Sequence, residues 1–324
     1  MSSTPLRRSR DVPTLVAQAR AGDPRAVARL VSLVENGDDA LPNIARALTP
    51  HTGQAQVIGL TGSPGVGKST ITNELVREFR RTDRRVGVLA VDPSSPFTGG
   101  AILGDRVRMQ DHATDPGVYI RSMSSRGHLG GLAAATPQAV RVLEGAGCDV
   151  VLVETVGVGQ AEVEVASLAD TTLVLLAPGM GDAIQAVKAG ILEIADVFVV
   201  NKADRDGADA TYRDIQGMIG LAERGPGEWR PQVVRAVAVR SEGIDDVVAA
   251  IDKHRAWLEA HGELRRRRET RAAAEVEAIA LGTLRDRMGS LRDGAALPAL
   301  AAKVAAGELD PYAAASELLD SLDV

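Results

Sequence analysis

Residues 57–70 read Val57-Ile58-Gly59-Leu60-Thr61-Gly62-Ser63-Pro64-Gly65-Val66-Gly67-Lys68-Ser69-Thr70. An apolar, β-rich run is followed by the pattern GxxxxGK[ST], and an amphipathic segment comes next. Glycines in such a loop let successive backbone N–H groups approach phosphate oxygens that a Cβ would hold off. The first turn of the following helix adds partial positive charge. This order predicts a strand, a phosphate-binding loop (P-loop) and a helix, with a nucleoside triphosphate as ligand.

The residues expected to hold the phosphates are Gly62, Ser63, Pro64, Gly65, Val66, Gly67, Lys68, Ser69 and Thr70. Lys68 is expected to reach the β and γ phosphates, and the Ser69 hydroxyl to ligate Mg²⁺. The chain has 33 glycines, so a chance match in a glycine-rich turn is the alternative. The complete pattern, placed between a strand and an amphipathic segment, favours the phosphate site.

A second motif indicates the base. Val197-Phe198-Val199-Val200 predicts a buried strand, and Asn201-Lys202-Ala203-Asp204 follows at its carboxyl end. Ligands bind at that end of the strands in open α/β sheets. The Asp204 carboxylate can accept hydrogen bonds from the ring N–H and amino group of guanine, and Lys202 can lie along the base. GTP is therefore predicted over ATP, the alternative being an ordinary polar turn.

Apolar runs and helical segments alternate through the middle of the chain. The predicted strands are Val57–Leu60, Val86–Val91, Val118–Ile120, Val150–Val153, Thr172–Leu176, Val197–Val200 and Val233–Val239. Near-continuous apolar runs are typical of strands covered on both faces. The predicted fold is α/β, of the P-loop NTPase class, with a mainly parallel sheet flanked by helices.

Three parts are expected along the chain: an N-terminal helical segment (1–50), a nucleotide-binding domain (51–258) and a C-terminal helical arm (259–324). The arm is too thin to bury a core of its own, so its apolar stripes need a surface to cover, for which a second copy is one candidate. Arg265 to Arg268 form either a docking patch for an acidic partner or, preferably, a solvated helix face.

Acidic residues at strand ends are candidates for a metal site. Asp92 ends the run Val88–Val91, Asp105 lies in the following loop, and Glu154 ends another strand. Mg²⁺ prefers such hard oxygen ligands, although each residue can instead be a turn or cap residue. Gly157 follows Glu154 by three residues, where its N–H can sense the γ phosphate. The expected catalytic residues are Lys68, Asp92, Glu154 and Gly157.

Composition narrows the class of protein. The 324 residues are 45% hydrophobic and 25% charged, with a net charge of -6 and 2% aromatic residues. Neither a basic nucleic-acid surface nor a base-stacking platform is expected. The single cysteine, Cys148, cannot form an intramolecular disulfide. No run approaches the roughly 18 apolar residues of a membrane helix. We expect a cytoplasmic protein with no nucleic-acid or membrane partner.

Longer blocks of sequence resemble the MeaB/ArgK group of P-loop GTPases. These blocks are GSPGVGKST, VDPSSPFTGGAILGDR, ETVGVGQAEV and PGMGDAIQAVKAGILEIADVFVVNKAD, followed by a C-terminal helical region. The resemblance implies a G domain of the SIMIBI type that uses GTP, GDP and Mg²⁺. It also implies a homodimeric chaperone of an adenosylcobalamin-dependent acyl-CoA mutase, which gates cofactor loading and protects or reactivates the mutase. Methylmalonyl-CoA mutase is the commonest such client.

The resemblance also implies three switch segments. The loop after Asp92 corresponds to switch I, Glu154 to Gln160 correspond to switch II, and a third switch contains Asp182, Gln185 and Lys188. The last three recur every three residues, so they share one side of the segment if it is helical. A solvated polar face is the alternative from spacing alone.

The chain departs from the pattern of the group near the base. Where related proteins carry Ser-Ala after the last strand, this chain has Val237-Ala238, followed by Val239 and Arg240. We expect the Ala238 N–H to contact the guanine carbonyl without the help of a serine. Gln160 lies three residues beyond Gly157 instead of beside it. The sequence assigns no arginine finger, and Arg108 is a guess at one. Slow hydrolysis, accelerated by a partner that orders the switches, is therefore expected.

Three other classes of protein fit this sequence less well. A metal-insertion GTPase chaperone of related fold is expected to carry a His-rich tract or a CxxC site, but the five histidines are scattered. A protein-targeting GTPase is expected to carry a Met-rich domain, and only six methionines are present. A small-molecule kinase or ATPase is disfavoured by Asn201-Lys202-Ala203-Asp204.

Overall fold

The computed structural model describes residues 11–93, 112, 114–125, 135–155, 161–179, 192–222, 225, 227–292 and 296–320. The chain divides into two compact units, residues 1–271 and 272–324. The predicted boundaries after residues 50 and 258 remain predictions.

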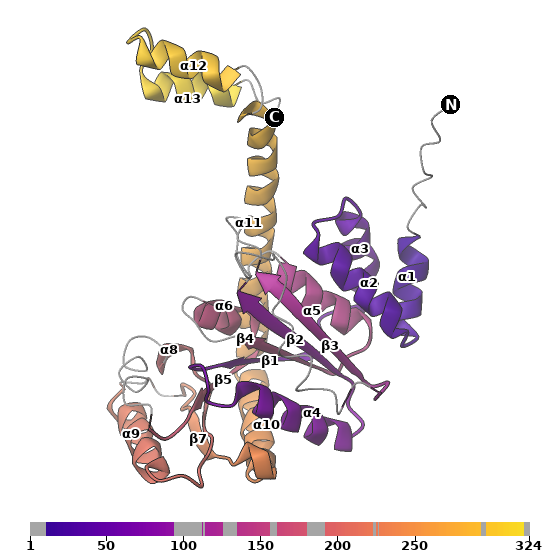
Figure 1. Ribbon diagram of the computed structural model, residues 1–324, viewed down its shortest axis with the longest axis vertical. Helices are drawn as coiled ribbons and strands as arrows, with labels where there is room; N and C mark the ends of the chain where they lie inside the picture. The colour runs from indigo at the N-terminus through magenta and orange to yellow at the C-terminus, as the bar shows by residue number, and fades with distance from the viewer. Residues whose placement is uncertain are drawn as a thin grey trace. The chain divides into compact units, whose positions relative to one another are not determined.

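The first unit is built on one parallel sheet of seven strands (Figure 1). The strands are β1 (Gln56–Thr61), β2 (Val86–Pro93), β3 (Val118–Ser125), β4 (Val150–Thr155), β5 (Thr171–Leu176), β6 (Val197–Val200) and β7 (Gln232–Arg235). Their order is β3-β2-β4-β1-β5-β6-β7, and every pairing is parallel. All residues of β1, β4, β5 and β6 are buried, as their apolar runs predicted. The predicted α/β fold is confirmed.

The last predicted strand, Val233–Val239, was too long. β7 ends at Arg235, and a short 3₁₀ turn, η5 (Ala238–Arg240), follows. Val237 turns away from β6 and pairs with Glu242 instead, its N–H donating to the Glu242 carbonyl at 2.9 Å. Ser241 has φ +55°, a left-handed conformation that closes this tight turn.

Helices cover both faces of the sheet. On one face α4 (Lys68–Arg81) and α10 (Ile244–Ala260) share a core with the sheet, including Leu75, Leu152 and Ile251. On the other face lie α5 (Ala135–Gly145) and α6 (Ala161–Leu168). Near β7, α9 (Ala208–Leu221) packs on Phe198, and α8 is a single turn (Leu192–Ile194).

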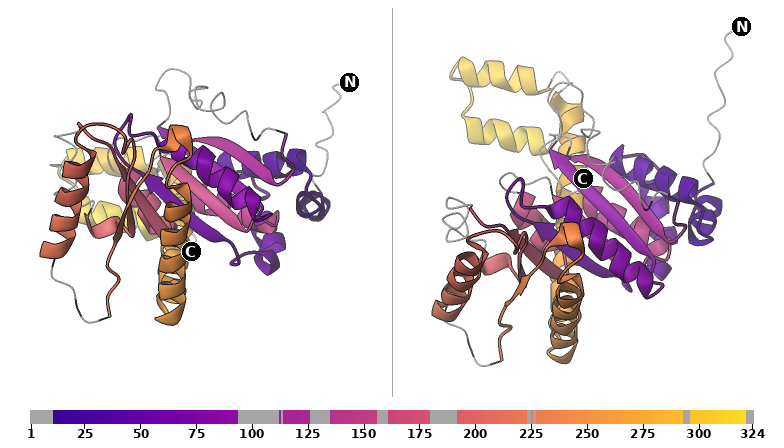
Figure 2. Two further views of the ribbon diagram at one scale, coloured as in Figure 1. Left: turned by 90° about the horizontal axis from the view of Figure 1, so that it is seen from below. Right: turned by 60° about the horizontal axis from the view of Figure 1, so that its bottom comes forward.

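Three short helices precede the sheet. They are α1 (Val12–Arg20), α2 (Pro24–Glu35) and α3 (Leu41–Leu48), and the 3₁₀ turn η1 (Thr49–His51) follows. Asp23 caps α2 by accepting a bond from the Arg25 N–H at 2.8 Å. Leu30 and Val31 join the core that contains α5, and Figure 2 shows the three helices together beside β3.

The second unit begins within α11 (Glu263–Arg292) and continues with α12 (Ala296–Ala305) and α13 (Pro311–Asp320). α12 and α13 pack on each other, and Asp310 caps α13 by accepting bonds from the N–H groups of Tyr312 and Ala313. Val276, Ile279 and Leu284 on α11 are exposed. Within the described ranges, no helix combines the length and the apolar character that crossing a membrane requires.

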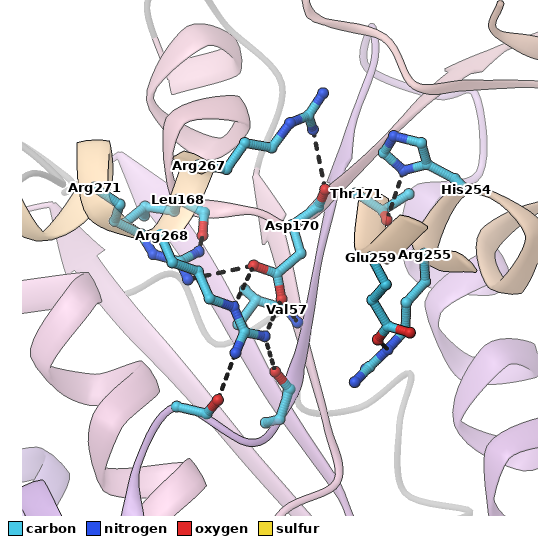
Figure 3. Close-up of polar contacts among 12 residues, drawn as sticks. Val57, Leu168, Asp170, Thr171, His254, Arg255, Glu259, Arg267, Arg268 and Arg271 are labelled. Atoms are coloured by element: carbon cyan, nitrogen blue, oxygen red, sulfur yellow. Dashed lines mark hydrogen bonds and ion pairs between the residues drawn. The ribbon is translucent and has the colours of Figure 1, made fainter. Parts of the chain in front are cut away.

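The first turns of α11 belong to the first unit and are held by an ion-pair cluster (Figure 3). Arg268 donates to Asp170 Oδ2 at 2.8 Å, and Arg271 lies 3.3 Å from Asp170 Oδ1. Arg267 forms a fork with the carboxylate of Asp196, at 2.9 and 3.0 Å. Asp170 precedes β5 and Asp196 precedes β6, so the cluster lies at the amino ends of these strands.

This cluster corrects the predicted solvated helix face for two of the four residues from Arg265 to Arg268. Arg265 and Arg266 are exposed and pair with Glu269 and Glu263 of their own helix. Arg267 and Arg268 point instead to carboxylates that lie 71 and 98 residues earlier in the chain. The run divides because Arg267 and Arg268 lie four and three residues before Arg271, so these three share one side of the helix, whereas Arg265 and Arg266 fall on the other side.

Candidate functional site

The predicted site residues of the P-loop, together with Glu154 and Asn201, lie at the carboxyl edge of the sheet. β4, β1, β5 and β6 are consecutive neighbours, so the segments that leave their carboxyl ends lie close together. The P-loop leaves β1, Glu154 lies near the end of β4, and Asn201 follows β6. This edge is where ligands bind in open α/β sheets.

The P-loop has a backbone that only glycine accommodates at two positions. Gly62 has φ +140°, and a Cβ there would lie 2.3 Å from the Leu175 carbonyl oxygen. Gly67 has φ +97°, and a Cβ there would lie 2.5 Å from Asn201 Nδ2. The loop therefore approaches both β5 and the residue after β6 too closely for side chains.

Lys68 holds a positive charge at this loop. Its Nζ donates to the Gly62 carbonyl at 2.6 Å and to the Ser63 carbonyl at 3.2 Å. The side chain is buried, so its charge is little screened by water. Because the ammonium carries three donors on a flexible stem, it can exchange these carbonyl oxygens for phosphate oxygens.

Ser69 and Glu154, both predicted metal ligands, lie in direct contact. The Ser69 hydroxyl donates to Glu154 Oε1 at 2.7 Å, and the Thr72 hydroxyl donates to Oε2 at 2.9 Å. Glu154 is only 3% exposed. A hydroxyl and a carboxylate placed together in this way are hard oxygen ligands, so the pair fits Mg²⁺.

Asn201 connects the two motifs. Its Nδ2 donates to the Val66 carbonyl of the P-loop at 2.8 Å, and its Oδ1 accepts from the Ala238 N–H at 3.1 Å. Its own N–H donates to the Leu176 carbonyl at the end of β5. Lys202 reaches the P-loop as well, its Nζ donating to the Gly65 carbonyl at 2.7 Å.

Asp204 and Arg240 face each other beside a hollow of about 260 Å³. Arg240 Nη1 lies 3.6 Å from Asp204 Oδ2, and the same guanidinium pairs with Glu242 at 2.9 Å. Val239 is exposed, whereas Ala238 is buried. The Ala238 N–H that we expected to contact guanine donates here to Asn201, so such a contact requires that this bond be shared or released.

Several predicted site residues lie outside the described part of the chain. These are Asp105, Gly157, Asp182, Gln185 and Lys188, as well as Arg108 and Gln160. Asp92 belongs to β2, but its side chain is also outside the description.

Four residues around the site, Thr72, Glu74, Arg77 and Ser241, were not anticipated. Thr72 contacts Glu154, as described above. The Ser241 hydroxyl donates to Glu74 Oε2 at 2.6 Å, which links η5 to α4 across 167 residues. Arg77 donates to Glu74 Oε1 at 2.8 Å. Only Thr72 had a usable signal, since it lies one helical turn after Ser69 and shares its side of the helix.

Comparison with known proteins identifies the family. The family model described as "Methylmalonyl Co-A mutase-associated GTPase MeaB" matches residues 27–292. This chain belongs to the MeaB family. The GTPase ArgK of Escherichia coli is 39% identical, over 78% of this chain and 79% of its own. The "Methylmalonic aciduria type A homolog, mitochondrial" of Mus musculus is 36% identical, over 81% of this chain and 64% of its own.

A solved structure agrees with the MeaB-family assignment. It is entitled "Crystal structure of LAO/AO transport system kinase", is 27% identical and has a TM-score of 0.69. The alignment covers 97% of this chain and 98% of the other. The resemblance to the MeaB/ArgK group is thus confirmed, and the chain is a P-loop GTPase.

Proposed function

We propose that this MeaB-family GTPase is a chaperone of an adenosylcobalamin-dependent acyl-CoA mutase, most simply methylmalonyl-CoA mutase. It would use GTP binding and hydrolysis to gate cofactor loading and to protect or reactivate the mutase. The description of the matching family model, which names a mutase-associated GTPase, supports this partner. The name of the mouse relative, which refers to methylmalonic aciduria, also supports it.

One observation carries the nucleotide part of the proposal: Asn201 and Lys202 each donate to a P-loop carbonyl, at 2.8 and 2.7 Å. Asp204 follows Lys202 by two residues, so these bonds support a short separation in space between Asp204 and the loop that would hold the phosphates. In the proposed complex, Asp204 accepts hydrogen bonds from guanine while the P-loop amides and Lys68 bind the phosphates. Base and triphosphate are then held by one connected set of residues.

Mg²⁺ is proposed as the metal because the chemistry of Ser69 and Glu154 fits it. The Ser69 hydroxyl has its hydrogen directed at Glu154, so its oxygen lone pairs remain available to a cation. Bound there, Mg²⁺ would neutralise charge that develops on the phosphates. Asp92 and Asp105 are proposed as further ligands of the metal.

Hydrolysis by the chain alone is proposed to be slow. Phosphoryl transfer depends on positioning and on positive charge against the developing negative charge. Among the described residues of the site, Lys68 is placed to supply this charge. A partner that orders the segments containing Gly157, Asp182, Gln185 and Lys188 would supply the remaining positioning.

A homodimer is also proposed. Val276, Ile279 and Leu284 expose apolar side chains along α11, and such a stripe gains stability when a second surface covers it. We further propose that the protein works in the cytoplasm.

Nucleotide choice tests base recognition. Wild type should bind GTP far more tightly than ATP or XTP, and Asp204→Asn should lose GTP affinity and gain XTP affinity. Unchanged GTP affinity in Asp204→Asn would remove the assignment of Asp204.

The partner is tested by single-turnover hydrolysis with and without purified methylmalonyl-CoA mutase. We expect the mutase to raise the rate. A rate that is already fast without the mutase, and unaffected by it, would contradict the chaperone proposal. Replacing the mutase by an unrelated acyl-CoA enzyme is the matched control.

A further inference from the structure

We infer that Thr72 is a positioning residue that orients Glu154 toward the metal-binding hydroxyl of Ser69. This inference rests on the proposed Mg²⁺-dependent nucleotide site. Thr72 contacts Glu154 and is not itself placed to touch the nucleotide or the metal.

The geometry divides the Glu154 carboxylate between two hydroxyls of α4. Oε1 accepts from Ser69 at 2.7 Å, and Oε2 accepts from Thr72 at 2.9 Å. The two hydroxyls lie on one side of the helix because they are three residues apart. With Oε2 held by Thr72, the carboxylate plane is fixed and Oε1 faces Ser69.

Burial makes this orientation consequential. Thr72 is fully buried and Glu154 is 3% exposed, so bulk water cannot readily replace either bond. A hydrogen bond to a charged acceptor in such surroundings is stronger than one between neutral groups. Removing one donor would cost the carboxylate a charge-assisted bond and weaken the orientation of Oε1 toward Ser69.

A purely structural role for Thr72 is the competing explanation. Its Oγ1 also lies 3.0 Å from the Lys68 carbonyl, a common arrangement for threonine within a helix. The hydroxyl has a single hydrogen, however, and the carboxylate is the stronger acceptor. We therefore assign that hydrogen to Glu154.

The two roles differ in their effect on metal binding. If Thr72 orients Glu154, the loss of its hydroxyl should weaken the binding of Mg²⁺. Nucleotide binding without metal should stay intact, because the P-loop amides and the Lys68 ammonium do not depend on the Thr72 hydroxyl. If Thr72 is only structural, its loss should affect folding stability alone.

The test uses full-length wild type, Thr72→Val and Thr72→Ser. GDP affinity is measured by calorimetry in EDTA and in Mg²⁺, and binding of Mn²⁺ to the GDP complex is followed by electron paramagnetic resonance. Thr72→Val, which is isosteric but lacks the hydroxyl, should bind GDP within about twofold of wild type in EDTA. Its Mn²⁺ affinity should fall about tenfold or more, as expected for a lost bond to a charged group. Thr72→Ser should restore wild-type behaviour.

Thr211→Val is the matched control. Thr211 is also buried in a helix and bonds back to the carbonyl four residues earlier, Gly207 O at 3.2 Å, but it lies in α9. It should leave Mn²⁺ affinity unchanged. If Thr72→Val does not fold, Thr72→Ala provides a second variant without the hydroxyl.

Wild-type Mn²⁺ affinity in a folded Thr72→Val or Thr72→Ala protein would overturn the inference. So would a Thr72→Ser protein as defective as Thr72→Val. Failure of the proposed function has a different signature: wild type itself would then bind no guanine nucleotide, or would bind it without any dependence on Mg²⁺.

Discussion

Replacing Asp170 by Asn should destabilise the first unit strongly. Asp170 accepts bonds from Arg268 and Arg271 and from the Val57 N–H at 3.1 Å, and it is almost completely buried. Asparagine is nearly isosteric and can still accept from Val57, but it leaves two guanidinium groups without their carboxylate. Breaking a buried ion pair in this way costs about 3–5 kcal/mol.

The lower end of that range is expected here. Arg268 also donates to the carbonyls of Gly53 and Ala55, and Arg271 donates to the Leu168 carbonyl, so neither loses every partner. We therefore expect a loss of about 3 kcal/mol in the free energy of unfolding. With a urea dependence of about 3 kcal/mol per molar, the unfolding midpoint should fall by about 1 M.

Urea unfolding followed by tryptophan fluorescence measures this change. Both tryptophans lie near the cluster: Trp229 donates from its indole nitrogen to the Asp196 carbonyl at 2.8 Å, and its ring packs 5.7 Å from that of Trp257. Nucleotide must be absent, because a bound ligand would add its own stabilisation.

Asp209→Asn is the matched control, since Asp209 pairs with Arg235 at 2.9 Å but is largely exposed. Its loss should cost less than about 1 kcal/mol. An Asp170→Asn protein as stable as Asp209→Asn would refute the view that the arginines of α11 stabilise the unit through Asp170.

Three further outcomes follow from the site and its surroundings. Gly67→Ala should lower GDP affinity more than tenfold in calorimetry, because φ +97° and the nearby Asn201 amide exclude a Cβ; Gly217→Ala, where the added Cβ meets no atom, should not change it. Ser241→Ala should cost about 1 kcal/mol in urea unfolding, and nothing further in a Glu74→Met background, which has no acceptor for the hydroxyl, if the 2.6 Å bond is the cause. Burial lowers the pKa of His254 to about 4 despite the nearby Asp196 charge. The unfolded state therefore takes up the extra proton, so stability should fall as pH drops from about 6.5 toward 4, and less so in His254→Gln.

Sequence predicted the parts of this molecule that are encoded locally. The strand before the P-loop, the loop itself and the residues Asn201 to Asp204 follow from patterns within a few residues of one another. The parallel sheet followed from apolar runs such as Val150–Val153. Because the edge of such a sheet gathers its strand ends, the approach of Ser69 to Glu154 could also be anticipated.

Other contacts between distant residues, which no motif or strand end marks, could not be predicted. Arg267 and Arg268 look no different in sequence from Arg265 and Arg266, and only the packing of the first turns of α11 separates the partly buried pair from the exposed one. The bond from Ser241 to Glu74 joins residues 167 positions apart, and it starts from a left-handed turn at Ser241 in a segment that the apolar run had suggested was close to the end of a strand.

The contacts of Asn201 limit where the nucleotide preference of this GTPase can be redesigned. The Asn201 side chain bonds to the P-loop and to the turn at Ala238, and the Asn201 backbone N–H bonds to the end of β5. A substitution at 201 would disturb the P-loop, where we propose that the phosphates bind, along with the turn beside the proposed base site. Asp204 makes no such contact with the P-loop among the bonds described above, so selection for a new base is best confined to residue 204 and the hollow beside it.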